Sequence, residues 1–157
     1  MLVLLGGCTG QKASTSTEDL KTYTFSEMDA HLKAKPRPMA IFFHAEWCKF
    51  CKNMEHTTFR DMEVVRQLNR DFYFISFDGE SKETVKFAGR DFKNYPTGRQ
   101  GGTHELMLEL GNINGSLAYP AFVLMDSDYK IMFEHGGFIS AKEMRGVLEA
   151  GIKAAAR

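Results

Sequence analysis

Residues 39–52 read MAIFFHAEWCKFCK, an apolar run followed closely by a pair of cysteines. Its first part, Met39 to Phe43, is a compact apolar run with the length and composition of a buried strand. The run leads directly into Cys48 and Cys51, after which the apolar residues recur at helical spacing. The stretch therefore predicts a buried strand followed at once by a helix that begins with a Cys-x-x-Cys pair.

The cysteine spacing has a chemical consequence, because residues three apart are neighbours on one helix face. The spacing suits a disulfide between Cys48 and Cys51. At the helix start, unpaired backbone N–H groups and the helix dipole stabilise a thiolate and lower the pKa of Cys48. We expect Cys48, exposed at the helix tip, to attack a partner disulfide, and Cys51, one turn deeper, to resolve the mixed disulfide.

The size of the dipole effect bears on the direction of exchange. The dipole contributes at most about 2 kcal/mol, so it lowers the pKa of Cys48 only moderately. A strong oxidant needs a much more acidic first cysteine, so the pair favours a reductase or isomerase. Lys49 adds a solvated positive charge of minor effect, and Phe50 offers apolar contact.

Other uses of a cysteine pair fit the sequence less well. A zinc site needs two further ligands, and the chain has no second Cys-x-x-Cys. Haem attachment needs a histidine directly after the second cysteine, where Lys52 stands. A purely structural disulfide over so short a loop would remove little unfolded-state entropy. We therefore expect no metal and no cofactor.

The composition limits the domain count and the partners. With 157 residues, of which 43% are apolar, the chain has material for one core and one domain. Lys plus Arg and Asp plus Glu number 20 each, so the overall charge does not direct the protein to nucleic acid. Partners are expected at a local site.

Apolar periodicity and turn residues predict the remaining elements. They are an extended piece near Tyr23; a helix that Ser26 caps and that Pro36 and Pro38 close; a helix break near Asp61, with a second helical stretch through Val64, Val65 and Leu68; a strand from Phe72 to Phe77; a helix capped by Thr103 and stopped by Gly111; a strand pair at 121–125 and 130–134; and a last helix opened by the capping box of Ser140 and Glu143. The order predicts an α/β fold with a single mixed β-sheet flanked by helices.

The stretch from Glu80 to Leu117 forms an insertion between the third strand and the final strand pair. Val85 and Phe87 alternate with polar residues ahead of Gly89, which favours a hairpin, whereas the region of Pro96 to Gly102 favours loop. The aromatic residues of the insertion form either a partner-recognition surface or a satellite core, and the core is favoured. These aromatic residues are Phe87, Phe92 and Tyr95.

The segment from Ala45 to Lys52, AEWCKFCK, resembles the active-site signature of the thioredoxin-like family. The residues that follow resemble the C-terminal domain of the DsbD thiol:disulfide interchange protein and related lipoprotein thioredoxins: Glu55, Thr58, Phe59, Asp61, Val64 and Leu68. The resemblance extends from Thr22 to Ala150. It implies a thioredoxin fold with an insertion before the cis-proline strand.

The resemblance also implies roles for individual residues. Cys48 would be the nucleophile and Cys51 the resolving thiol, while Trp47 would shield the site. Pro120 would be the cis-proline, in a loop that lies against the dithiol, and the backbone of Tyr119 would pair with the substrate chain. The alternative for Pro120 is an ordinary trans proline that opens a strand.

Three further positions bear on proton handling. Glu55 matches a carboxylate of the DsbD-like domains that could modulate proton transfer to the deeper thiol, and the alternative is a solvated surface glutamate. Many thioredoxins bury an aspartate six residues before the first cysteine, and this chain has Phe42 there. His44 is expected to be a packed or partly exposed histidine rather than a catalytic base.

The N-terminus suggests a location. Residues 1–8 resemble the end of a truncated bacterial lipoprotein signal, in which Leu5-Gly6-Gly7-Cys8 matches the lipobox and Cys8 would be acylated. The alternative is an apolar N-terminal segment with an incidental cysteine. Residues 9–19 are small and polar and are expected to form a flexible tether, which leaves residues 20–157 as the thioredoxin-like domain.

Together these features predict an extracytoplasmic thiol:disulfide oxidoreductase, lipid-anchored on the periplasmic side of a bacterial membrane. Its expected partners are disulfide-containing substrate proteins and a membrane thiol reductase as electron donor. The alternative is a thioredoxin-fold binding or chaperone module whose dithiol is regulatory.

Overall fold

A computed structural model describes residues 18–96 and 101–156. Cys8 and residues 9–17 lie outside the described residues, so the predicted lipidation site and most of the predicted tether stay predictions. Within the described ranges, every helix falls short of the length and apolarity needed to span a bilayer.

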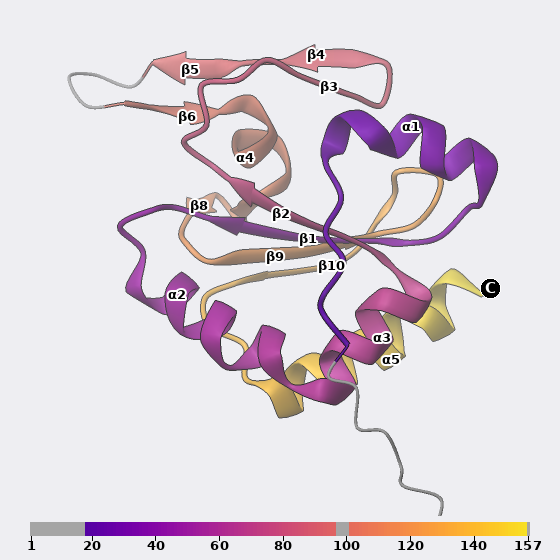
Figure 1. Cartoon of the computed structure of the whole chain (residues 1–157). Coiled ribbons are helices and arrows are strands. Elements are labelled where there is room, and N and C mark those ends of the chain that lie inside the picture. The colour runs from indigo at the N-terminus through magenta and orange to yellow at the C-terminus, as the bar shows by residue number, and fades with distance from the viewer. Residues whose placement is uncertain (1–17, 97–100, 157) are drawn as a thin grey trace, which may run out of the picture.

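The centre of the domain is a four-stranded mixed sheet in the order β10-β9-β1-β2 (Figure 1). Strand β1 (Met39–His44) pairs in parallel with β2 (Tyr73–Asp78) and antiparallel with β9 (Ala121–Met125). Strand β10 (Ile131–Gly136) pairs with β9 as a hairpin. The prediction of a single mixed sheet with a central buried strand is confirmed.

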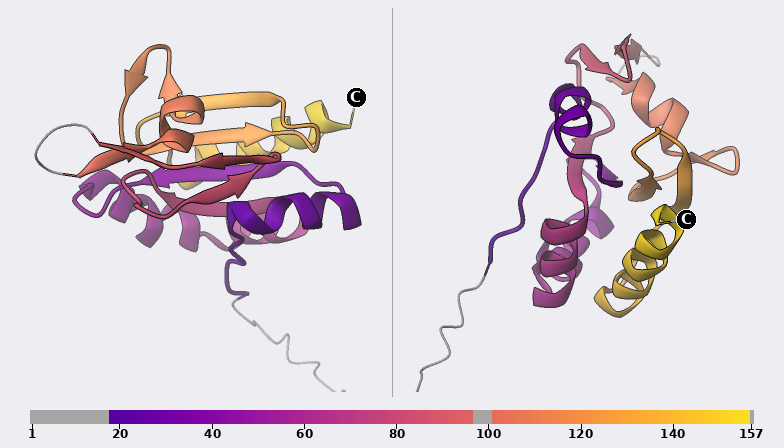
Figure 2. Two further views of the ribbon diagram at one scale, coloured as in Figure 1. Left: turned by 90° about the horizontal axis from the view of Figure 1, so that it is seen from above. Right: turned by 90° about the vertical axis from the view of Figure 1, so that its right-hand side faces the viewer.

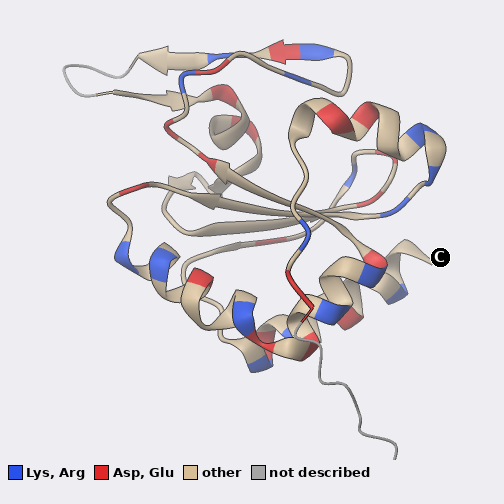
Figure 3. Cartoon of the chain, in the orientation of Figure 1, with Lys and Arg blue, Asp and Glu red and all other residues tan. Residues whose placement is uncertain are grey.

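Helices cover both faces of this sheet (Figures 1 and 2). Helices α2 (Lys49–His56), α3 (Met62–Asp71) and α5 (Ala141–Ala155) lie on one face. Helix α1 (Phe25–Ala34) lies on the other face together with the insertion. Figure 3 shows charged residues of both signs spread over the helices, whereas β1 and β9 contain none.

The alternation of side chains along β1 divides the core in two, because successive residues of a strand point to opposite faces. Met39, Ile41 and Phe43 pack on the face of α1 and the insertion, in what we call the insertion-side core. Ala40 and Phe42 pack on the face of α2, α3 and α5, in what we call the dithiol-side core. All five side chains are buried.

The insertion forms small hairpins and one short helix. Its elements are β3 (Val85–Phe87), β4 (Arg90–Phe92), β5 (Asn94–Pro96), β6 (Gly102–His104), α4 (Glu105–Leu110), β7 (Asn112–Ile113) and β8 (Ser116–Leu117). The predicted hairpin at Gly89 is confirmed as the pair β3 and β4. The predicted loop from Pro96 to Gly102 is wrong at its ends, which pair as β5 and β6.

The aromatic residues of the insertion divide between core and surface. Phe87 and Phe92 are buried in the insertion-side core, which confirms the core interpretation for these two. Tyr95 is 60% exposed, so the core interpretation is wrong for this residue. Tyr95 pairs with Thr103, and successive residues of a strand point to opposite faces, so its ring lies on the face opposite to the buried His104.

Two predicted helix caps are one or two residues from the observed ones. Helix α1 is capped by Thr24 rather than Ser26, because Glu27 accepts hydrogen bonds from the backbone and hydroxyl of Thr24 at 2.8 and 2.7 Å. Helix α4 is capped by His104 rather than Thr103, because the His104 Nδ1 accepts from the backbone of Leu106 at 3.2 Å.

The piece near Tyr23 is extended but forms no strand. It is joined to the outer edge of β2 by a backbone hydrogen bond of 2.8 Å from Tyr23 to Phe74. The capping box of Ser140 and Glu143 at the start of α5 is confirmed.

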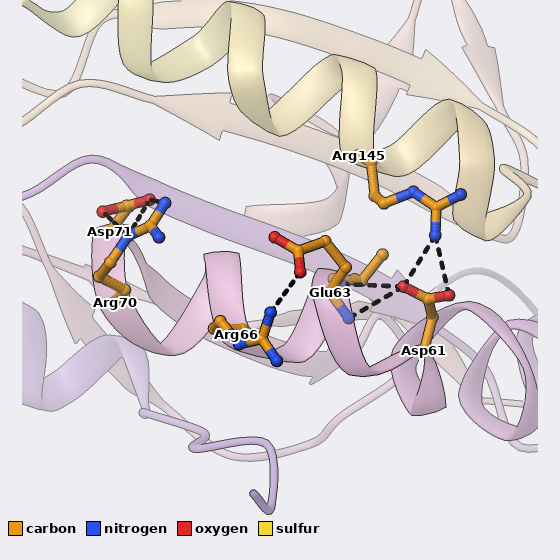
Figure 4. A network of polar contacts seen from close by, with 7 residues as sticks. Asp61, Glu63, Arg66, Arg70, Asp71 and Arg145 are labelled. Atoms are coloured by element: carbon orange, nitrogen blue, oxygen red, sulfur yellow. Dashed lines mark hydrogen bonds and ion pairs between the residues drawn. The ribbon is translucent and has the colours of Figure 1, made fainter.

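The break predicted near Asp61 is present and orders the layer beneath the dithiol. A short 3-10 turn, η1 (Thr58–Arg60), follows α2, and Asp61 then caps α3 by accepting from the backbones of Glu63 and Val64 at 3.1 Å each. Figure 4 shows that the same carboxylate also accepts from Arg145 of α5, at 3.0 Å. Asp61 therefore ties α5 to the segment that follows the redox helix.

Candidate active site

The structure brings Cys48 and Cys51 together as a disulfide with 5.3 Å between the two Cα atoms. Cys48 is the N-cap of α2, and the backbone N–H of Cys51 donates to the Cys48 Sγ at 3.1 Å. A helix start carries N–H groups that lack partners within the helix, and one of them here points at the sulfur. The donor group that would stabilise a thiolate is thus already in place in the oxidised form.

The burial of Cys48 corrects the sequence prediction. Cys48 is only 3% exposed and Cys51 only 1%, so the first cysteine does not protrude at the helix tip. Both belong to the dithiol-side core, and Tyr119 packs against that core. Sequence spacing placed the cysteine correctly at the start of the helix but could not show its burial, which depends on packing with residues distant in the sequence.

The residues beside the cysteines remain on the surface. Trp47 and Phe50 are each 64% exposed, and Lys49 is exposed as expected. A buried disulfide bordered by two exposed aromatic rings gives an apolar surface around a reactive bond. Such a surface suits contact with another polypeptide.

The loop before β9 carries the predicted cis-proline, and the Tyr119–Pro120 peptide bond is cis. The Pro120 carbonyl accepts from the backbone of Gly137 at 2.7 Å, which joins the loop to the end of β10. Because Ala121 pairs with Phe43 near the end of β1, the cis-proline loop lies at the same edge of the sheet as the segment that leads to Cys48. The backbone role predicted for Tyr119 toward a substrate stays a prediction.

The Tyr119 ring occupies a tight place between the two cores. It packs against the insertion-side core as well as the dithiol-side core. A Cβ atom at Gly79 would collide with the phenol, so the ring lies directly over this glycine. Burial raises the pKa of the phenol well above its usual value, and the negative charges of Glu80 and Asp78 raise it further. The ring is therefore neutral at physiological pH.

Trp47 is oriented by two contacts. Its indole Nε1 donates to the Glu80 Oε1 at 3.0 Å. Its ring meets that of Tyr119 edge to face, with 5.7 Å between the centroids. Sequence reasoning missed Glu80, which lies in the inserted stretch and far from the cysteines along the chain. One feature could have pointed to Glu80. Strands β1 and β2 are parallel, so Trp47 after β1 and Glu80 after β2 lie at the same edge of the sheet.

The three positions that bear on proton handling, Phe42, His44 and Glu55, differ in their burial. Phe42 is fully buried and meets Phe59 at 4.8 Å between ring centroids, so an apolar ring occupies the place of the buried aspartate. His44 stacks on Phe42 at 5.7 Å and is partly exposed, which confirms the packed interpretation. Glu55 is half-buried and lines a groove with Phe42 and Phe59. Its proton-transfer role stays a prediction.

Metal ligands do not gather at this site. Over residues 18–96 and 101–156, no group of three or more His, Cys, Asp or Glu side chains is placed to hold a metal ion.

The chain is similar to a known protein family and to solved structures. The family model described as "Thioredoxin-like domain" matches residues 25–152. A comparison with curated protein sequences found no match. The solved structures similar to this chain include the DsbH oxidoreductase, with 17% identity, a TM-score of 0.62 and 95% of each chain covered.

Two further structures share the architecture. A thioredoxin from Thermus thermophilus has 20% identity and a TM-score of 0.63, with 88% of this chain and 91% of that chain covered. The C-terminal domain of DsbD from Neisseria meningitidis, in its reduced form, has 22% identity and a TM-score of 0.52, with coverage of 79% and 90%. At these identities the likenesses show the fold.

The family match spans most of the chain, and the chain belongs to the thioredoxin-like domain family. With the Cys48–Cys51 disulfide at the head of α2, it is a thioredoxin-like oxidoreductase with a CxxC active-site disulfide.

The contact between Gly79 and Tyr119 yields a stability prediction. We expect Gly79→Ala to lower the free energy of unfolding by about 1–3 kcal/mol, because the new methyl group overpacks against the phenol ring. Gly146 lies in α5 with open space around its Cα, so Gly146→Ala is the control and should raise the free energy of unfolding by up to about 1 kcal/mol. Urea unfolding measures both, and equal effects of the two substitutions would contradict the packing described.

Proposed function

We propose that this protein is an extracytoplasmic thiol:disulfide oxidoreductase that reduces or isomerises disulfides in other proteins. The single observation that carries the proposal is the hydrogen bond from the Cys51 backbone to the Cys48 Sγ at the start of α2. A structural disulfide needs no such donor, whereas a sulfur that must carry negative charge does.

The proposed reaction has two exchange steps. The Cys48 thiolate attacks one sulfur of the substrate disulfide, and the other substrate sulfur leaves as a thiolate. The Cys51 thiolate then attacks the Cys48 Sγ, which forms the Cys48–Cys51 disulfide and releases the second substrate thiolate. Two electrons pass to the substrate, and the disulfide in the structure is the oxidised product of this half-cycle.

A dithiol donor must return the electrons. Exchange runs in reverse when a donor thiolate attacks the Cys48–Cys51 disulfide and its partner thiol completes the transfer. We propose a membrane thiol reductase as this donor, because the sequence features of residues 1–19 support a membrane location. The exposed rings of Trp47 and Phe50 support contact with both donor and substrate.

The surroundings of the pair support a reductase or isomerase rather than a strong oxidant. One backbone N–H contacts the Cys48 sulfur directly, and the exposed Lys49 adds a screened charge. With Phe42 buried beneath the pair, proton transfer to Cys51 cannot use a carboxylate at that position. Glu55, in the next turn of α2, is the proposed substitute.

The location is proposed from the sequence. The Leu5-Gly6-Gly7-Cys8 pattern supports acylation of Cys8, and residues 9–19 are suited to a tether between the lipid and the domain. The protein would then stand on the periplasmic side of a bacterial membrane.

Substitution of each cysteine separates an enzyme from a binding module. We expect Cys48→Ser to lower the rate of insulin disulfide reduction at least about 100-fold, because the nucleophile is lost. Cys51→Ser should instead accumulate mixed disulfides between Cys48 and the substrate, visible on non-reducing gels. Full turnover by both variants, or no turnover by the unaltered protein with intact substrate binding, would favour the binding or chaperone module.

The reduction potential of the pair decides the direction of exchange. We expect a value near that of thioredoxin, about −270 mV, in equilibrium with glutathione. The reason is the moderate stabilisation of the Cys48 thiolate by one helix start. A value close to about −120 mV, typical of a strong oxidant, would overturn the reductase assignment.

The lipid anchor has its own test. In a bacterial host that exports the protein through a lipoprotein signal peptide, Cys8→Ser should abolish labelling with palmitate and release the protein from the membrane fraction. Cys48→Ser is the matched control, since it removes a cysteine without touching the lipobox. Equal labelling of the Cys8→Ser variant and the control would disprove acylation at Cys8.

A further inference from the structure

The indole of Trp47 is held in place although most of it faces solvent. The side chain is 64% exposed, yet its Nε1 donates to Glu80 and its ring meets Tyr119 edge to face. An exposed aromatic ring with no polar partner would sample several rotamers. The hydrogen bond to Glu80 selects one of them and places the indole beside the cis-proline loop.

Glu80 is itself held by the insertion. Its backbone N–H donates to the Asp78 carboxylate at 2.9 Å. The Asn94 side chain in β5 donates to the carbonyls of Glu80 and Ser81 at 3.1 and 2.9 Å. The neighbouring carbonyl of Gly79 accepts from the backbone of His104 in β6 at 2.8 Å. The segment 79–81 is therefore fixed by both strands of one hairpin of the insertion.

We propose that Glu80 is a positioning residue of the redox site, which holds Trp47 against Tyr119 and thereby controls access to the Cys48 sulfur. The Tyr119 ring lies between Gly79 and the core that contains both cysteines. Trp47 meets this ring edge to face, and Cys48, the next residue along the chain, is 3% exposed. Through Asn94 and Glu80, the insertion thus fixes the orientation of the Trp47 indole beside Cys48.

The arrangement has opposite consequences for small and large reactants. Cys48 is 3% exposed, so a small alkylating reagent reaches its sulfur only when neighbouring groups move, and a fixed Trp47, the residue before it, should slow this reaction. A protein substrate docks on the indole, and a fixed indole lowers the entropy lost on docking. Removing the hydrogen bond between Glu80 and Trp47 should therefore speed alkylation of Cys48 and weaken the binding of a protein that carries a disulfide.

The variants separate position from charge. Glu80→Gln keeps an oxygen that accepts from the indole and removes the charge, whereas Glu80→Ala removes both. Asn94→Ala loosens the support of Glu80 from the insertion. Glu83→Ala is the matched control, because Glu83 is an exposed carboxylate on the same loop.

Three readouts are measured on the full chain. The chain has one tryptophan, so time-resolved fluorescence anisotropy reports on Trp47 alone. Iodoacetamide alkylation of Cys48 in the reduced protein is followed by peptide mass mapping. Steady-state insulin reduction gives kcat and KM separately.

We expect Glu80→Ala to free the indole, to raise the alkylation rate of Cys48 about 3- to 10-fold, and to raise KM for insulin by a similar factor with little change in kcat. Glu80→Gln and Glu83→Ala should match the unaltered protein. Asn94→Ala should change each readout in the same direction as Glu80→Ala. The variant that carries both substitutions should show less than the sum of the two effects, because both act on the contact between Glu80 and Trp47.

Unchanged anisotropy and alkylation in Glu80→Ala would overturn the proposal, and so would equal effects of Glu80→Gln and Glu80→Ala, which would assign the effect to charge. The inference rests on the proposed function only for the insulin readout. If the unaltered protein fails to reduce insulin, the proposed function fails, while anisotropy and alkylation still decide the role of Glu80.

Discussion

Strand β1 is buried on both of its faces, and the layers of the domain are arranged around it. Its first five residues, Met39 to Phe43, are all apolar and buried, so the strand can be accommodated only between two layers. Met39, Ile41 and Phe43 require one layer, and Ala40 and Phe42 require the other. The chain leaves this strand at a fixed place and in a fixed direction, so the next turn delivers Cys48 to the start of α2.

The strand directions then gather the remaining parts of the site. Because β1 and β2 run in parallel, the residues that follow each strand lie at one edge of the sheet, and Trp47 meets Glu80 there. Strand β9 runs the opposite way and begins at that edge, which brings Pro120 and Tyr119 to the same place. The site thus draws on three segments that are far apart in the sequence, and its polar contact between Trp47 and Glu80 is a product of topology.

The parts that could be predicted are those whose cause is local. The buried strand, the helix that starts at the cysteine pair, the break at Asp61 and the capping box of Ser140 each follow from neighbouring residues. Cap positions were missed where two polar residues compete. At Thr24 the choice depends on the Glu27 carboxylate, which is three residues away and reaches the backbone of only one candidate. The burial of Cys48 and the role of Glu80 could not be predicted, because the first depends on packing with residues distant in the sequence and the second on contacts with Trp47 and the insertion.

The position of Tyr119 has a consequence for how such a protein can change over generations. Among the described residues, Tyr119 alone packs against the two cores that the sheet otherwise keeps apart. Substitutions within either core are compensated by neighbours in the same layer, so each layer can drift at its own pace. Only at the Tyr119 ring would substitutions in the two cores be coupled. A larger or smaller side chain next to the ring in the insertion-side core would have to be matched by a change in the dithiol-side core.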